Sequence, residues 1–166
     1  MQRDSEAGMG RVRGFSLIEL LIVVAIILII AAIAVPSYLH ARIEANESSA
    51  VGSLRTVNTA EITYNSSYPT VGYAGSLSAL GGTSCSPPSS TSGCLIDTVL
   101  AGGLKSGYTF SMSGASGTPN ASYQLIATPV LWDVSGIRYF CSFQDAVLRY
   151  SLTVISTCDA SVSTLN

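Results

Sequence analysis

The feature that most constrains the fold is an apolar run from Leu17 to Val35 that contains a single charged side chain, Glu19. As an α-helix, residues 17–36 would extend about 30 Å, the thickness of the hydrocarbon core of a bilayer. Leu, Ile, Val and Ala occupy every side of this helix, so no polar stripe is left to face water. The run therefore predicts a helix that lies in lipid or among other apolar helices.

Glu19 is the one residue in this run whose insertion into lipid is unfavourable. An acidic side chain at the centre of a bilayer costs about 2.5 to 3.5 kcal/mol on insertion scales. We therefore expect the Glu19 carboxylate to have a compensating partner.

The residues that flank the run predict its orientation. Arg11 and Arg13 precede it and His40 and Arg42 follow it, a weak bias that keeps the N-terminus in the cytoplasm and exports the remainder. All the cysteines lie in the exported part, where an oxidising compartment allows disulfides to persist. They are Cys85, Cys94, Cys141 and Cys158.

Composition argues for one small exported domain of low charge. After the leader and the helix, about a hundred of the 166 residues remain, which suits one domain. The net charge is −2 and charged residues make up only 11% of the chain. Direct nucleic-acid binding is therefore not expected.

Beyond Pro36 the helical pattern continues, but the apolar side chains gather on one stripe with polar residues opposite. Glu47 and Glu61 lie near the stripe and interrupt it. A stop signal at residues 65–69 (Asn-Ser-Ser-Tyr-Pro) should end the helix. A proline inside a helix removes one hydrogen bond and clashes with the preceding turn, so a kink or a melted turn is expected at Pro36. The stripe consists of Ile43, Ala50, Leu54, Val57, Ala60 and Tyr64.

The rest of the exported part is predicted to be a loop followed by a sheet. Residues 69–107 are rich in Gly, Ser and Pro, with one short helix expected over 95–101 and ended by Gly102 and Gly103. After Gly107 the apolar period changes to two, which predicts an antiparallel sheet of about four strands. The stripe is expected to cover its apolar face. The expected strands are residues 108–112, 123–127, 137–143 and 147–150.

The stretch Arg-Gly-Phe-Ser-Leu-Ile-Glu at residues 13–19, followed by the apolar run, resembles the N-terminus of the type IV pilin family, which includes the pseudopilins of type II secretion. The resemblance covers residues 12 to about 68, and beyond them the chain resembles pilin heads only in its order of elements. In that family a prepilin peptidase cuts after the glycine, and the new N-terminal phenylalanine is methylated. The matching residues are Gly14, Phe15, Leu17, Glu19 and Pro36.

The resemblance implies an α+β, type IV pilin-like fold. A long helix, membrane-spanning in its first half and amphipathic in its second, would pack on a small antiparallel sheet. The true start would be Met1 or Met9. The implied division is a cytoplasmic leader (1–14), a transmembrane or filament-core helix (15–36), its amphipathic continuation (37–67) and an exported head (68–166), with a loop at about 69–107 and the sheet and C-terminal region at about 108–166.

In function, the resemblance implies a structural pilin that is cleaved between Gly14 and Phe15, methylated at Phe15 and polymerised through its N-terminal helix. Implied partners are the prepilin peptidase, an inner-membrane assembly platform with its ATPase, and minor pilins. The precursor would cross the inner membrane once and end in an extracellular pilus. One alternative is a pseudopilin in a short periplasmic pseudopilus, and another is a membrane-anchored binding protein that never polymerises.

Cleavage would also supply the partner that Glu19 needs, because it creates a positively charged α-amine on Phe15. Pairing within one chain would only make burial of the carboxylate tolerable. Pairing with the Phe15 of a neighbouring subunit would set the axial register between helices. Buried ion pairs serve specificity more reliably than stability, which favours the second arrangement.

The four cysteines permit three pairings, and sequence alone does not decide among them. Proximity favours Cys85 with Cys94, which would close the Ser/Pro-rich loop. It also favours Cys141 with Cys158, which would tie the third expected strand to the C-terminal segment and resembles the disulfide-bounded region near the C-terminus of many pilins.

No catalytic site, metal site or cofactor is expected. The sequence contains no nucleophile-elbow, phosphate-loop or zinc-protease motif. His40, the single histidine, is expected at the surface, and the head aspartates are too scattered for a calcium site. These aspartates are Asp97, Asp133, Asp145 and Asp159.

The mature N-terminus tests the cleavage hypothesis. An ordinary secretory signal would use the Ala-Ile-Ala site at residues 32–34 and leave Val35 first. Mass spectrometry of the mature protein is expected to find a methylated Phe15 instead. A chain that starts at Val35 would refute the pilin interpretation.

Overall fold

The computed structural model describes residues 14–82 and 85–165. The chain divides into two compact units between Tyr38 and Leu39. The described part of the first unit holds the beginning of one long helix, and the second unit holds the rest of this helix and the head. The expected leader (1–14) lies outside the described residues except for Gly14, and so do Met9, Arg11 and Arg13.

Helix α1 runs over 51 residues, Leu17–Ser67. It is helical without a break at Pro36, so no turn is melted there, and a kink stays a prediction. It ends inside the predicted stop signal. By length and composition, α1 is the one candidate membrane span among the described residues.

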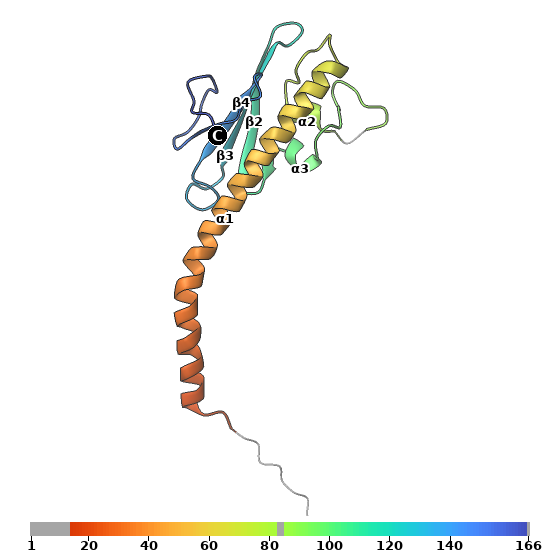
Figure 1. Cartoon of the computed structure of the whole chain (residues 1–166). Coiled ribbons are helices and arrows are strands. Elements are labelled where there is room, and N and C mark those ends of the chain that lie inside the picture. The colour runs from red at the N-terminus through yellow and green to blue at the C-terminus, as the bar shows by residue number, and fades with distance from the viewer. Residues whose placement is uncertain (1–13, 83–84, 166) are drawn as a thin grey trace, which may run out of the picture. The chain divides into compact units, whose positions relative to one another are not determined.

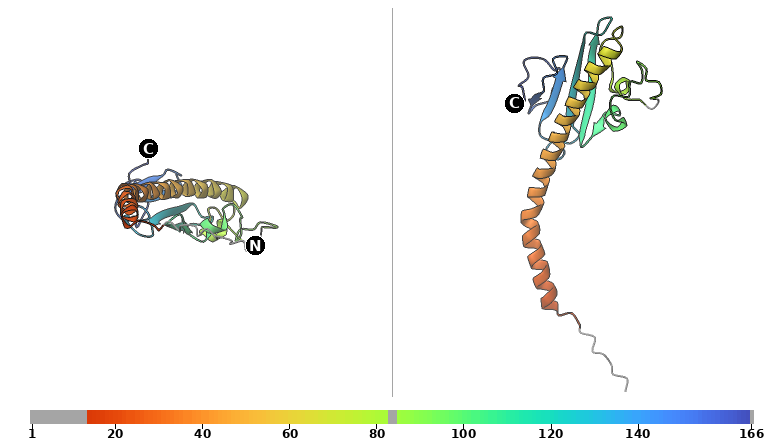
Figure 2. Two further views of the ribbon diagram at one scale, coloured as in Figure 1. Left: turned by 90° about the horizontal axis from the view of Figure 1, so that it is seen from below. Right: turned by 45° about the vertical axis from the view of Figure 1, so that its right-hand side comes forward.

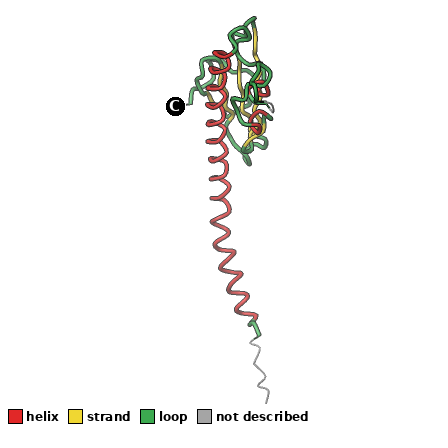
Figure 3. The backbone as a smooth tube through the Cα atoms, turned by 90° about the vertical axis from the view of Figure 1, so that its right-hand side faces the viewer, coloured by secondary structure: helices red, strands yellow, loops and turns green. Residues whose placement is uncertain are grey.

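The second half of α1 covers the head. Figures 1 and 2 show it lying across one face of the sheet, and Figure 3 shows the strands on one side of it. Every residue of the predicted stripe, from Ile43 to Tyr64, is buried. Because the opposite side of the helix carries Ser, Thr and charged residues, the sequence pattern alone decides which side faces the sheet. The prediction of an α+β fold with this packing is confirmed.

The sheet has five antiparallel strands in the order β1-β2-β3-β4-β5. The strands are β1 (Leu104–Lys105), β2 (Tyr108–Ser116), β3 (Ser122–Pro129), β4 (Tyr139–Phe143) and β5 (Arg149–Ser151).

The expectation of about four strands was therefore one short, because β1 has only two residues and lies in the expected loop. β4 also begins at Tyr139, two residues later than predicted. The amides of Ile137 and Arg138 donate to the Glu47 carboxylate instead of joining the ladder. β5 begins at Arg149 rather than Val147, whose amide donates to Asp145.

Two short helices precede the sheet: α2 (Leu77–Leu80) and α3 (Thr98–Ala101). The sequence missed α2. It predicted α3 but started it at Leu95, whose amide instead donates to the Leu80 carbonyl. Asp97 begins α3 by accepting from the Leu100 amide, a side-chain cap of the usual N-terminal kind.

The sheet is buried on both faces at β3 and β4, whereas one face of β2 is exposed. Side chains that alternate along β3 and β4, such as Leu125 and Phe140, face α1 and form the main core. Their neighbours Ile126 and Cys141 lie in a second, smaller cluster with Ile155 and Cys158. The C-terminal segment therefore contributes a second cover, which explains why the sequence around β4 is almost continuously apolar.

The stripe can be tested at Leu54, which is fully buried. Leu54→Ala is expected to lower the free energy of unfolding by about 2 to 5 kcal/mol, because it leaves a cavity between α1 and the sheet. Ile62, 59% exposed on the same helix, is the matched control. Ile62→Ala should change stability by about 0.5 kcal/mol or less. Urea unfolding of the detergent-solubilised chain measures both, and equal losses would contradict the packing described here.

Candidate processing and assembly site

The predicted cleavage bond, between Gly14 and Phe15, is exposed. Gly14, Phe15 and Ser16 precede α1 without regular structure, and all three are exposed. A Cβ placed on Gly14 would meet no atom within 4 Å, and its backbone is not left-handed. The described part of the fold therefore does not require glycine at this position.

Glu19 lies in the first turn of α1. Its Oε2 accepts a hydrogen bond of 2.9 Å from the Ser16 amide. Ser16 and Glu19 have the spacing of a capping box, in which a glutamate at the third helical position accepts from the amide of the capping residue. This role was missed from the sequence, although the Ser-x-x-Glu spacing was visible in it. A negative charge at this end also interacts favourably with the helix dipole.

Apart from Glu19, residues 17–35 offer apolar side chains only. From Leu17 to Val35 the side chains are exposed, apart from a half-buried Ala31. No ion pair to Glu19 is formed within the described residues. The arrangement thus joins an accessible Gly-Phe bond, a carboxylate one turn further and a membrane-length apolar helix.

One family model matches the chain, over residues 9–35, and its description is the prokaryotic N-terminal methylation motif. This segment is a type IV pilin or pseudopilin cleavage–methylation signal. The resemblance of the N-terminus to the type IV pilin family is thereby confirmed, and the signal ends before the head begins. Neither a curated protein nor a solved structure matches the chain significantly.

The cleavage–methylation signal carries several coarse consequences. It supports a type IV pilin-like or pseudopilin precursor, processed by a prepilin peptidase and assembled at a membrane. Together with the apolar helix it fits a membrane-anchored precursor. Such signals mark structural pilin-like proteins, which are not enzymes.

The head places its four cysteines in two disulfides, Cys85–Cys94 and Cys141–Cys158. The first closes a loop beside Gly82 and Ser92. The second joins β4 to the C-terminal segment, so it fastens the cover of the second sheet face.

Two carboxylates that seemed to interrupt the stripe are anchoring points. Glu47, almost fully buried, accepts from the Ile137 and Arg138 amides at 2.9 and 3.0 Å. It also pairs with Arg138 Nε at 2.6 Å. Three donors on one carboxylate compensate the loss of its hydration. Helix α1 is thereby fastened to the start of β4.

Glu61 is completely buried, and in the described part of the chain its one hydrogen-bond donor is the Ala74 amide, 2.8 Å from its Oε2. Its Oε1 has no hydrogen-bond partner among the described residues. Burial raises the pKa of Glu61 from its ordinary 4.5 to about 7, and the Ala74 hydrogen bond offsets this only in part. In turn its charge helps burial to raise the pKa of Tyr64 and of Tyr123.

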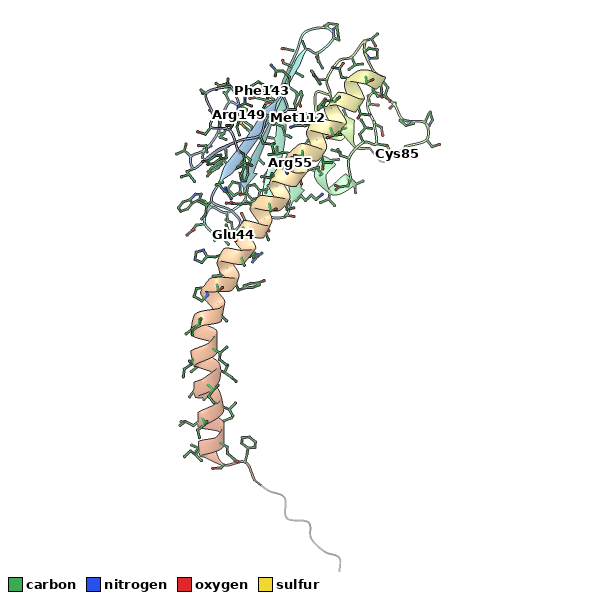
Figure 4. All side chains as sticks on the ribbon, viewed as in Figure 1. Glu44, Arg55, Cys85, Met112, Phe143 and Arg149 are labelled. Atoms are coloured by element: carbon green, nitrogen blue, oxygen red, sulfur yellow. A yellow bond between two sulfur atoms is a disulfide. The ribbon has the colours of Figure 1, made fainter. Side chains whose placement is uncertain are left out.

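The remaining candidates have local roles. Asp97 caps α3 and pairs with Lys105, which together hold its pKa below the usual value. Asp145 pairs at 2.6 Å with Arg149, whose guanidinium lies 4.3 Å from the Phe143 ring centroid (Figure 4).

His40 is exposed, as are Asp133 and Asp159. Within residues 14–82 and 85–165 no three His, Cys, Asp or Glu side chains gather in a way that could hold a metal ion.

The burial of Glu61 makes the free energy of unfolding depend on pH. Folded protein holds the Glu61 proton up to about pH 7, whereas the unfolded chain releases it near pH 4.5. Stability should therefore fall as the pH rises between these values. Glu61→Gln removes the ionisation, so above pH 7 it should be more stable than wild type by roughly 1 to 3 kcal/mol and similar below pH 4.5. Denaturant unfolding across this range measures the difference.

Glu44 is the control for this test, because it is exposed on the same helix. Glu44→Gln should leave the pH profile unchanged. Parallel profiles for wild type and Glu61→Gln would contradict the argument.

Proposed function

We propose that the chain is a structural pilin subunit that is cleaved between Gly14 and Phe15, methylated at Phe15 and polymerised into a type IV pilus-like filament. The observation that carries the proposal is the combination of an exposed Gly-Phe bond with Glu19 one helical turn further, within a cleavage–methylation signal. The chain's role is structural and not enzymatic, and it needs no cofactor or metal.

Cleavage changes the electrostatics at the start of α1. The bond that joins Gly14 to Phe15 is neutral, and its hydrolysis leaves an ammonium group on Phe15. A carboxylate placed in hydrocarbon costs about 2.5 to 3.5 kcal/mol, so a nearby ammonium is a strong attractor for Glu19. We propose that the ammonium of a neighbouring subunit fills this role and sets the register between helices.

The apolar helix provides the polymerisation surface. In the precursor, residues 15–36 are surrounded by lipid, and in the filament they are surrounded by the same segment of other subunits. Lipid tails and Leu or Ile side chains are similarly apolar, so exchanging one for the other changes the free energy little. A platform with its ATPase supplies the work of extraction, and Pro36 would let the helix bend where subunits crowd.

The proposed organisation follows from this cycle. Residues 1–14 form a cytoplasmic leader that is removed, 15–36 the span and later filament core, 37–67 the amphipathic continuation and 68–166 the exported head. The precursor crosses the inner membrane once with its N-terminus in the cytoplasm, and minor pilins join the filament outside.

A pseudopilin is the second candidate, because the cleavage–methylation signal is common to both groups. The disulfide loop Cys85–Cys94 and the disulfide at the C-terminal segment favour a pilus subunit. A membrane-anchored binding protein that never polymerises is the third.

The assembly role of Glu19 is tested with Glu19→Gln. Filaments recovered by shearing are expected to fall at least tenfold, since one lost charge pairing worth about 1.4 kcal/mol already changes each subunit contact tenfold. The leader should still be removed, which mass spectrometry of membranes reports. Glu44→Gln, on the exposed side of the same helix, should assemble like wild type. Normal filaments from Glu19→Gln would refute the register role.

Electron microscopy of cells with native expression separates the candidate functions. A pilus subunit gives long surface filaments, a pseudopilin gives none outside the cell at this expression level, and a non-polymerising protein is recovered only as monomer. Long filaments labelled by a tag on this chain are the expected result.

A further inference from the structure

Two segments leave the sheet at the same end of the head. This end lies beside the residues of α1 that begin the second unit. The β3–β4 connection, residues 130–138, leaves at the end where β2 begins, because Pro129 pairs with Tyr108. β5 ends there as well, since Ser151 pairs with Tyr139 at the start of β4. The connection lies beside α1 at this end in Figure 1, near the labelled Glu44 in Figure 4.

This end of the head exposes large apolar side chains, which we call the basal patch. Each is more than half exposed, and Trp132 is the chain's single tryptophan. The basal patch consists of Val130, Leu131, Trp132, Val134 and Leu152. Exposed patches of this kind, rather than scattered single residues, mark interaction surfaces.

The connection that carries most of the basal patch is held firmly on α1. Asn46 Nδ2 donates to the Ser135 carbonyl at 2.9 Å. At the end of the connection, the Glu47 carboxylate accepts from the amides of Ile137 and Arg138. Within the connection, the Leu131 amide donates to Ser135 Oγ at 3.0 Å. The apolar side chains are thus displayed on a fixed support.

One residue of the basal patch lies beside the first residues of α1 in the second unit. Leu152 lines a groove together with His40 and Ile43 of α1. His40 comes four residues after Pro36, which is about 6 Å of helix. The polar headgroup layer adds about 5 to 8 Å on each side of the hydrocarbon core, so chain connection alone brings residue 40 to headgroup level.

We propose that the basal patch binds the headgroup layer of the membrane that residues 17–36 span, and so seats the head on the lipid surface before assembly. Tryptophan is enriched at this level of membranes because its ring is apolar and its N–H is polar. Asp133, exposed between Trp132 and Val134, limits the depth to the headgroups. His40 and Arg42, exposed on α1, can meet lipid phosphates.

Lipid is the occupant favoured over a second copy of the chain, because the span tethers the patch to the bilayer. Tethering makes the contact intramolecular, so a weak interfacial affinity suffices to populate it. The proposal rests on the membrane span of the proposed function but requires no polymerisation.

Trp132 provides its own probe. The full chain is reconstituted in phosphatidylcholine vesicles, and flotation reports insertion of the span independently. Emission of Trp132 is expected to shift to shorter wavelength on reconstitution. Lipids brominated high on the acyl chain should quench it several-fold more strongly than lipids brominated at the methyl end. The double variant Leu131→Ser/Val134→Ser, at exposed positions, should lose most of this quenching.

The matched control moves the reporter away from the patch. In the variant Trp132→Phe/Ser66→Trp the new indole lies on α1, about 30 Å along the helix beyond residue 46. Its emission should be neither shifted on reconstitution nor quenched by brominated lipid. Emission of Trp132 typical of water, with the chain floating, would overturn the proposal while leaving the span intact. An emission shift of Trp132 that grows with the protein-to-lipid ratio, without quenching by brominated lipid, would also overturn the proposal. It would show that the basal patch binds a second copy of the chain.

Discussion

The need to keep the apolar side chains of α1 away from water governs this protein along the whole helix. Over residues 43–64 the apolar side chains form a stripe, and the sheet of the same chain buries it. Over residues 17–35 they surround the helix, and no part of one head could cover all sides. The first half must therefore find its apolar surroundings outside the chain, in lipid or in other helices. The same helix thus forms part of the core of the head in its second half and exposes an apolar surface in its first half.

Three glutamates interrupt this apolar helix, and each is compensated differently. Glu19 caps the helix start by accepting from the Ser16 amide, and its proposed partner is the ammonium that cleavage would create. Glu47 meets two amides and a guanidinium, which anchor α1 to the start of β4. Glu61 has a single donor and is compensated by holding its proton. The role of a carboxylate inside an apolar surface can thus be assigned only when the hydrogen-bond donors around it are known.

The sequence predicted the elements whose pattern is local. The 3.6-residue stripe identified the buried side of α1, and the period of two located β2 and β3 correctly. The wrongly predicted start of β5 has a local cause, the Asp145 carboxylate two residues before Val147, but the start of β4 depends on a partner that is distant in sequence. β4 starts late because Glu47, about ninety residues earlier, takes the amides of Ile137 and Arg138.

The candidate site was readable for a different reason. Processing signals are contiguous, so Gly14, Phe15 and Glu19 could be recognised from the order of residues alone. Roles that depend on the tertiary fold could not be. Glu47 and Glu61 looked like flaws in the stripe, since no spacing rule reveals that the Arg138 and Ala74 amides meet them. The basal patch was equally hidden, because β-strand pairing brings residues 130–134 and 152 to one end of the sheet.

The Cys141–Cys158 bond has a consequence for the timing of maturation. It fastens a segment without helix or strand over the second sheet face. In a reducing cytosol the segment would be held only by packing and by a few hydrogen bonds, such as the one from the Cys158 amide to Gln124. In the proposed export, this disulfide would form only on the oxidising side of the membrane, so the head would gain its last covalent support after crossing.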